Sequence, residues 1–224
     1  MNERSMNEPP VRGRPMILYR VLRWTMSFYF RARMKIRFEG EENVPKGGPF
    51  FLVLSHQSDL DSLLLHTFCP RLIFTLAKSS VFRTRLMAWL APRVGAVPTR
   101  RYQIDPQSVR VVLRLIERGE GVGVFAEGER SWDGKLQPLR GGTIRVLLKA
   151  GVPVIPCGLV GTYEILPRWG HMNWFKLGLG REPVTIRYAK PILFGRHDDR
   201  ASREQARPEA TARIESALHA VMLR

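Results

Sequence analysis

The sequence has few cysteines, and this shortage limits the kinds of site that it can build. Only two of its 224 residues are cysteine, Cys69 and Cys157, and both stand among apolar neighbours. Neither makes a metal-ligand spacing with the five scattered histidines. We therefore expect two buried free thiols in a reducing compartment, and neither a disulfide framework nor a metal site.

The sequence also lacks a long apolar run. Its longest mainly apolar stretch, residues 16–30, is interrupted by Arg20 and Arg23. A helix that crosses a bilayer needs about 20 predominantly apolar residues. We therefore expect no transmembrane helix, and the first residues do not have the pattern of a secretory signal.

Acidic residues are scarce relative to basic ones. The chain has 36 Lys and Arg against 20 Asp and Glu, a net charge of +16 and a sequence pI near 10.9. The electrostatic field of such a positive net charge attracts nucleic acid, anionic lipid headgroups, phosphorylated substrates or acidic carrier proteins. The charge alone does not distinguish among these partners. The length and the hydrophobic content of 44% suit one α/β domain with a sizeable core.

The N-terminal region combines positive charge with helical periodicity. Residues 1–37 hold nine Lys or Arg and two Glu, and residues 1–15 read as a flexible basic leader. From there, apolar residues recur at helical spacing with aromatic residues and arginines between them: Leu18, Val21, Leu22, Met26 and Phe30. This pattern predicts an amphipathic helix that lies in a membrane interface. The alternative is a helix packed on the core with a solvated basic face.

Predicted strands and helices alternate along the rest of the chain. The expected strands are residues 50–54, 71–77, 95–101, 121–125, 152–161 and 184–192. The expected helices are residues 62–70, 79–94 with Ser79 or Ser80 as cap, 105–119 with Asp105 as cap, 141–151 and 207–223. This alternation predicts a single α/β domain with a mixed, mainly parallel sheet flanked by helices.

The stretch "SHQSDLD", residues 55–61, joins the first strand to the next helix. His56 lies in the turn, and Ser58 with Asp61 fits the capping-box spacing. If the helix starts after His56, the imidazole can fold back to Asp61, whose carboxylate would fix the tautomer and leave one ring nitrogen as a base. The alternative is a polar turn in which Asp61 only caps the helix.

Two further stretches carry polar residues after predicted strands. In "FAEGERS", residues 125–131, Gly128 lets the backbone approach a ligand closely. Arg130 is placed to bind a phosphate through the donors of its guanidinium group. In "GAVPTRR", residues 95–101, two arginines end an extended segment. Taken singly, each also fits a solvated connection.

The order of these blocks resembles a known family. His-x₄-Asp after a strand is followed by Gly-x₂-Pro-x₂-Arg, Phe-x-Glu-Gly-x-Arg-Ser and Val-Pro-Val-Ile-Pro. The four ordered blocks resemble the glycerolipid acyltransferases, whose best-known members are the 1-acyl-glycerol-3-phosphate acyltransferases. The resemblance covers about residues 38 to 192, and it implies an acyltransferase domain at residues 38–224 behind a leader and membrane-interfacial helix at residues 1–37.

The resemblance assigns roles to seven residues. It implies that His56 is the catalytic base and Asp61 its partner. It implies that the substrate is bound by Lys78, Arg101, Glu127, Gly128 and Arg130. Ala126 and Glu129 replace the usual Pro and Thr of the third block, and Arg100 falls where an acidic residue is common. The extra carboxylate of Glu129 puts the phosphate-bearing acceptor in question.

The resemblance implies transfer of a fatty acyl chain from acyl-CoA or acyl carrier protein to the free hydroxyl of 1-acyl-glycerol-3-phosphate, which gives phosphatidic acid. It requires no cofactor and no metal. The expected partners are the two substrates and an anionic membrane surface, without nucleic acid. The expected location is peripheral, on the cytoplasmic face of the plasma membrane.

Two alternatives stay open at this point. The acceptor is another lyso-lipid, such as a lyso-ornithine lipid, because a displaced charge can change acceptor choice. Otherwise the chain is a non-catalytic basic protein that binds a membrane or nucleic acid, in which case replacing His56 would change no activity.

Overall fold

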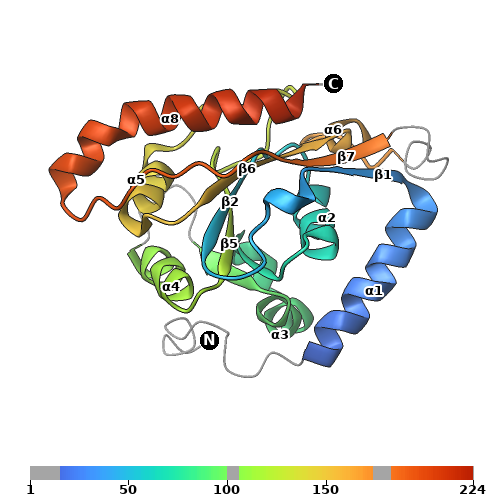
Figure 1. The fold of residues 1–224 in the computed structure, drawn as a ribbon. Coiled ribbons are helices and arrows are strands. Elements are labelled where there is room, and N and C mark those ends of the chain that lie inside the picture. The colour runs from blue at the N-terminus through green and yellow to red at the C-terminus, as the bar shows by residue number, and fades with distance from the viewer. Residues whose placement is uncertain (1–15, 100–105, 174–182, 224) are drawn as a thin grey trace.

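The fold is a seven-stranded sheet with helices on both faces (Figure 1). The computed structural model describes residues 16–99, 106–173 and 183–223. The predicted leader at residues 1–15, the arginine Arg101 and the cap Asp105 lie outside the described residues.

The sheet is mixed and mostly parallel, as predicted. Its strand order is β1-β7-β6-β2-β5-β3-β4. Strands β2 to β6 share one direction, whereas β1 and β7 are parallel to each other and β7 is antiparallel to β6. The strands are β1 Lys35–Glu39, β2 Phe50–Leu54, β3 Ile73–Lys78, β4 Ala96–Thr99, β5 Gly121–Phe125, β6 Val154–Val160 and β7 Pro183–Tyr188.

The helices form two layers because the central strand is apolar on both sides. Phe50, Leu52 and Leu54 of β2 join the core under α1 and α2, while Phe51 and Val53 join the core under α4, α5 and α8. The helices are α1 Met16–Arg33, α2 Leu60–Phe68, α3 Arg85–Arg93, α4 Pro106–Glu117, α5 Gly141–Ala150, the one-turn α6 Thr162–Ile165 and α8 Arg200–Met222, with 3₁₀ turns η2 Glu41–Asn43 and η3 Ser79–Phe82.

Two helix starts differ from the sequence predictions. The α-helix of the 79–94 segment is capped by Thr84, whose hydroxyl accepts from the Met87 N–H, so the predicted caps Ser79 and Ser80 are wrong. Both serines lie in η3 instead. Helix α8 begins at Arg200 rather than at residue 207, because the Asp199 side chain caps it through the Ser202 N–H.

The N-terminal helix forms as predicted, and an unpredicted strand follows it. Strand β1 has only five residues with the alternating burial of an edge strand, which is a weak sequence signal. It pairs with β7 and crosses the predicted boundary at residues 37 and 38, so that division of the chain stays a prediction. In the described part of the chain, no helix has both the length and the apolar character that a membrane span requires.

Helix α8 approaches β6 closely at Gly158, and this contact gives a stability prediction. A Cβ at Gly158 would lie 2.8 Å from the backbone oxygen of Val221 in α8. Gly158→Ala should therefore cost about 1–3 kcal/mol of unfolding free energy by urea denaturation, since the helix must shift. Gly142→Ala is the control, because a Cβ there meets nothing within 4 Å and a helix gains from alanine. Equal stability of the two variants would contradict this packing.

Candidate active site

The site forms at the carboxyl ends of two neighbouring parallel strands. Leu54, the last residue of β2, pairs in register with Phe125, the last residue of β5. The stretch that follows each strand therefore emerges at the same edge of the sheet, which brings residues 55–61 beside residues 126–131. Two of the sequence blocks that resemble the acyltransferases meet here.

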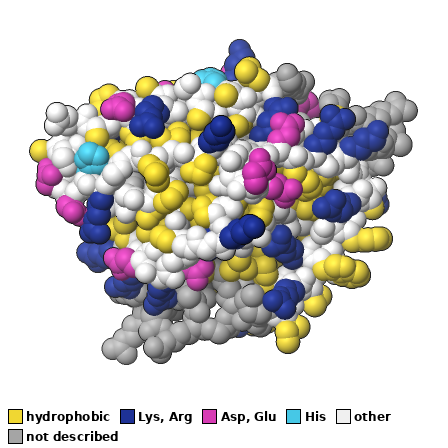
Figure 2. Space-filling model, viewed as in Figure 1, with side chains coloured by type: hydrophobic (Ala, Val, Ile, Leu, Met, Phe, Trp, Pro, Cys, Tyr) yellow, Lys and Arg dark blue, Asp and Glu magenta, His cyan; other side chains and the backbone are white. Residues whose placement is uncertain are grey.

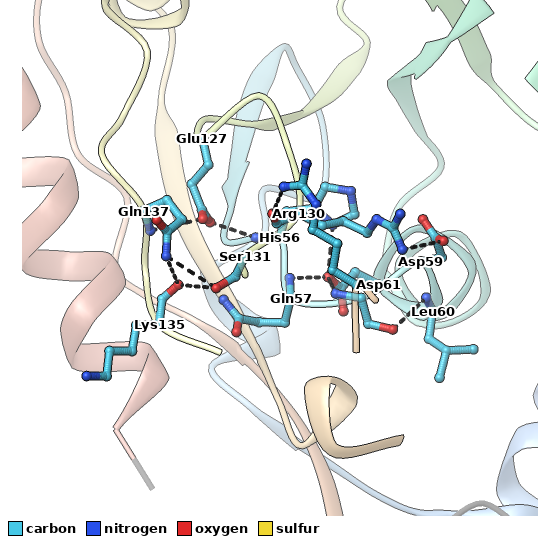
Figure 3. Close-up of polar contacts among 12 residues, drawn as sticks. His56, Gln57, Asp59, Leu60, Asp61, Glu127, Arg130, Ser131, Lys135 and Gln137 are labelled. Atoms are coloured by element: carbon cyan, nitrogen blue, oxygen red, sulfur yellow. Dashed lines mark hydrogen bonds and ion pairs between the residues drawn. The ribbon is translucent and has the colours of Figure 1, made fainter. Parts of the chain in front are cut away.

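One oxygen of Asp61 organises the first turn (Figure 3). Its Oδ2 accepts from the backbone N–H of Gln57 at 2.6 Å and of Ser58 at 2.7 Å, and it lies 3.1 Å from Nδ1 of His56. The Ser58 hydroxyl in turn accepts from the Leu60 N–H at 3.2 Å. The His–Asp pair therefore forms, and its carboxylate oxygen also accepts from the Ser58 N–H, which is one of the two bonds of the predicted capping box. The other bond is not made: the Asp61 N–H donates to the Ser58 carbonyl instead of the Ser58 hydroxyl, and the N-cap of α2 is Asp59.

The ring of His56 is held in one orientation. It is buried and stacks on Phe125, with ring centroids 4.0 Å apart and planes at 25°. Because Oδ2 of Asp61 already accepts two backbone N–H groups, it is an acceptor, and Nδ1 of His56 donates to it. In the neutral ring, this leaves Nε2 as the nitrogen without a proton.

Glu127 binds the backbone of the turn at residues 55–61. It is 2% exposed, and its two carboxylate oxygens accept from the His56 N–H at 2.7 Å and the Gln137 N–H at 3.0 Å. Burial raises the pKa of Glu127 to about 7, against the opposing effect of these two N–H donors. The contacts that the structure gives Glu127 are to the protein's own backbone, and its predicted role in substrate binding stays a prediction.

Ser131 completes the link between the two turns. Its N–H donates to the His56 carbonyl at 2.7 Å, so the peptide units on either side of His56 are bound by the third block. The Ser131 hydroxyl donates to the Lys135 carbonyl, and the Gln137 amide donates to Asp133. Sequence reasoning did not single out Gln137, since a glutamine in a polar loop carries no motif.

Gly128 has a positive φ of 74°, a backbone conformation that glycine adopts readily because it has no Cβ. Its close neighbour is Arg140, whose Nε would lie 2.2 Å from an added Cβ and which donates to the Glu127 carbonyl at 3.0 Å. The close approach seen at Gly128 is therefore to another residue of the chain. Its predicted approach to a ligand stays a prediction.

Two charged residues of the third block, Glu129 and Arg130, form ion pairs with residues outside the block. Glu129 forms ion pairs with Arg168 at 2.9 Å and Arg140 at 3.4 Å, so its carboxylate is balanced by two guanidinium groups. Arg130 pairs with the exposed Asp59 at 2.8 Å (Figure 3), and the Arg168 guanidinium donates to the Arg130 carbonyl at 2.6 Å. Arg140 and Arg168 were missed from the sequence, because neither lies in a motif.

Lys78 lies further along the same edge. It is the exposed last residue of β3, and β3 is separated from β2 by β5 alone. With strands about 4.8 Å apart, its backbone is about 10 Å from the end of β2. The structure thus brings His56, Asp61, Glu127, Gly128 and Arg130 together and leaves Lys78 at the side, while Arg101 lies outside the described residues.

Several buried polar atoms of the turn at residues 55–61 have no hydrogen-bond partner among the described residues. They are Ser55 Oγ, both side-chain polar atoms of Gln57 and Oδ1 of Asp61. Unpartnered buried polar atoms are costly and rare in proteins, so these atoms are available to bind water or a ligand. Within the part of the chain that the structure describes, no group of three or more His, Cys, Asp or Glu side chains is arranged to hold a metal ion.

Comparison with known families gives an independent assignment. Residues 35–160, more than half of the 224-residue chain, match the family model described as Acyltransferase. The chain belongs to this acyltransferase family. All seven residues predicted for the site lie inside the matched segment.

Individual relatives agree with the family. The chain is 35% identical over 138 residues to a chloroplastic 1-acyl-sn-glycerol-3-phosphate acyltransferase of Brassica napus. This match covers 59% of this chain and 39% of the relative. It is 30% identical over 135 residues to a 1-acyl-sn-glycerol-3-phosphate acyltransferase of Borreliella burgdorferi, covering 58% of this chain and 53% of the relative. The chain therefore spans about two fifths to one half of these relatives' lengths.

The fold also has a solved counterpart. The crystal structure of the 1-acyl-sn-glycerophosphate acyltransferase of Thermotoga maritima matches with a TM-score of 0.66 and 24% identity, over 92% of this chain and 83% of the other. At this identity the likeness establishes the fold. The α/β class, the mostly parallel sheet and the N-terminal helix predicted from the sequence are confirmed.

The buried carboxyl of Glu127 makes stability depend on pH. Its pKa is raised from an ordinary 4.5 to about 7, so the folded state holds its proton more tightly than the unfolded state. The resulting stabilisation is fully present below about pH 4.5 and is lost as the pH rises to about 7, and it amounts to at most about 3 kcal/mol.

Urea denaturation of the wild type and of Glu127→Gln at pH 5 and pH 8 measures this effect. The variant has no titrating carboxyl at this position, so the wild type should lose more stability than the variant between the two pH values. Equal pH dependence of the two proteins would show that Glu127 does not titrate in this range.

Proposed function

We propose that the chain transfers a fatty acyl group from a thioester to the free hydroxyl of 1-acyl-glycerol-3-phosphate, with His56 as general base. The observation that carries the proposal is the buried His56–Asp61 pair, in which Nδ1 faces the carboxylate and Nε2 is left for the substrate. The family assignment and the names of the curated relatives support the same reaction.

The proposed reaction needs one proton to move twice. Nε2 of His56 takes the proton of the acceptor hydroxyl as its oxygen attacks the thioester carbonyl carbon. The tetrahedral intermediate then collapses, the carbon–sulfur bond breaks, and the imidazolium returns the proton to the leaving thiolate. Asp61 holds the ring and stabilises the imidazolium, much as the carboxylate of a hydrolase triad does. General-base catalysis of this kind contributes roughly 10²–10⁴-fold in rate.

The acceptor phosphate would be held by basic residues at the edge of the site. Arg130 is suited to this role because its side chain is 24% exposed and its partner Asp59 is 64% exposed, so a phosphate can replace a weak surface ion pair. The pairing of Glu129 with Arg140 and Arg168 removes the main objection to a phosphate here, since its charge is already balanced. Lys78 and Arg101 remain proposed contributors.

The proposed donor is acyl-CoA or acyl carrier protein, used as a co-substrate. Both carry negative charge and are attracted by a chain of net charge +16. The proposed mechanism uses no other cofactor.

We place the protein peripherally on an anionic membrane, at its cytoplasmic face. Helix α1 supports this placement, since it carries arginines together with exposed aromatic and aliphatic side chains. A lyso-lipid acceptor and its product both reside in such a membrane, so the enzyme would work where its substrate is dissolved.

Thiol release from acyl-CoA or from acyl carrier protein by the purified protein, with and without 1-acyl-glycerol-3-phosphate, tests the reaction. Release should depend on the acceptor and fall by about 10²–10⁴-fold in His56→Ala. Release that requires a lyso-ornithine lipid instead would retain the dyad and overturn the acceptor. Release that His56→Ala leaves unchanged would overturn the role of His56 as the base, and no release with either acceptor would favour a binding protein.

The acceptor phosphate has its own test. Arg130→Gln should raise KM for the acceptor by about tenfold or more, since a charge-assisted hydrogen bond is lost, with a smaller effect on KM for the thioester. Arg145→Gln is the matched control, because Arg145 pairs with Glu204 between α5 and α8, away from the site. Equal KM values for the two variants would contradict a phosphate contact at Arg130.

A further inference from the structure

A basic groove lies between α1, β1 and the carboxyl end of α2. It has a volume of about 430 Å³, and its lining includes Arg20, Arg23 and Arg31 on the α1 side and Phe38 and Phe68 on the other. Helix α2 starts beside the turn at residues 55–61 and ends at this groove, eight residues after its first residue. The groove is therefore about 12 Å along α2 from that turn and is a separate site.

The three arginines are directed to one side of α1 by helical spacing. Residues 20, 23, 27 and 31 follow one another at intervals of three or four, so their side chains share a face. Arg23 donates to the Cys69 carbonyl at 2.7 Å, and Arg31 stacks over the rings of Phe38 and Phe68. These contacts hold two guanidinium groups in place.

The positive charge of the groove is not balanced by the protein. Among the residues that the structure describes, no carboxylate lies within ion-pair distance of Arg20, Arg23 or Arg31. The acidic residue in the lining is Glu41, so three guanidinium charges against one carboxylate leave a net +2. An ordered cluster of this kind fits a phosphate, which guanidinium groups recognise with paired hydrogen bonds.

An exposed apolar stripe runs along α1 beside the groove. It consists of Ile17, Val21, Trp24 and Phe28, which recur at intervals of four, three and four residues and are exposed by 79%, 51%, 71% and 71%. Figure 2 shows hydrophobic side chains projecting in a row at the right-hand edge, where α1 lies, with basic side chains among them. Trp24 belongs to both features, since it also lines the groove.

We propose that this groove binds the phosphate of an anionic phospholipid headgroup in the bilayer, while the stripe of Ile17, Val21, Trp24 and Phe28 enters the interface beside it. The adjacency of the two features decides between a lipid and a soluble anion. A soluble phosphate would use the arginines and leave four large apolar side chains in water, whereas a bilayer lipid satisfies both.

The proposal deepens the membrane placement proposed above and rests on it. It adds a second lipid site, distinct from the acceptor site at Arg130, which orients the protein by one defined face. Membrane attachment by this face would depend on the anionic lipid content of the bilayer as well as on apolar insertion.

Vesicle binding by the full chain tests the site with a pair of matched variants. Arg20→Gln with Arg31→Gln removes two charges from the groove. Arg33→Gln with Arg37→Gln removes two exposed charges from α1 and β1 outside its lining. Co-sedimentation with phosphatidylcholine vesicles containing phosphatidylglycerol should weaken about 25-fold in the groove variant, at about fivefold per basic residue, and less than about fivefold in the control.

Equal losses in the two variants would overturn the proposal, since they would indicate diffuse attraction without a headgroup site. Arg20→Gln alone makes the result independent of the stacking of Arg31 and should still weaken binding about fivefold. Millimolar inorganic phosphate should not displace the wild-type protein from vesicles. If phosphate displaces the protein, the groove is a site for free anions instead.

A second measurement separates this proposal from the proposed function. Thiol release with a short-chain acceptor in the absence of vesicles should be unchanged in the groove variant, which shows that it folds. If the wild type releases no thiol and yet binds vesicles through the groove, the enzymatic proposal fails alone. If it releases thiol and the groove variant binds vesicles like the wild type, the headgroup site fails alone.

Discussion

A single carboxylate oxygen, Oδ2 of Asp61, holds the start of α2 and the ring of His56 at the same time. Its two backbone N–H bonds fix the turn after β2, and its third contact fixes the tautomer of the imidazole. Because Asp61 is fully buried, these bonds are made away from competing water, where they are strongest. The geometry of the proposed base therefore depends on the same residue, Asp61, that holds the turn before α2.

The third block supports this turn from the neighbouring strand. Glu127 and Ser131 bind the backbone N–H and carbonyl of His56, so the histidine is held through its main chain as well as its ring. Arg140 and Arg168 balance Glu129 behind the loop and leave Arg130 at its accessible edge. The site thus separates buried groups that hold His56 from a partly exposed cation, Arg130, that is suited to a phosphate.

The sequence predicted the parts of this arrangement that follow from periodicity and order. The apolar run of residues 50–54 predicted a buried strand, and the resemblance of the blocks around His56 and Glu127 to the acyltransferases implied that the two turns belong to one site. Arg140 and Arg168 were not predicted, since ion pairs between distant loops depend on the tertiary fold alone. The family resemblance implied that Glu127 and Gly128 bind substrate. The structure shows Glu127 in contact with the His56 backbone and Gly128 close to Arg140, so both have contacts within the chain. The groove beside α1 was also missed, because it combines residues from three elements.

The tautomer of His56 tests the central claim most directly. In ¹⁵N-edited NMR of histidine-labelled protein, with His56 assigned from a His56→Gln variant, the neutral ring should carry its proton on Nδ1 and leave Nε2 unprotonated. Asp61→Asn should disturb this pattern, since the oxygen that orients the ring loses its charge. A ring protonated on Nε2 in the wild type, or a pattern unaffected by Asp61→Asn, would contradict the role of Asp61 in positioning the base.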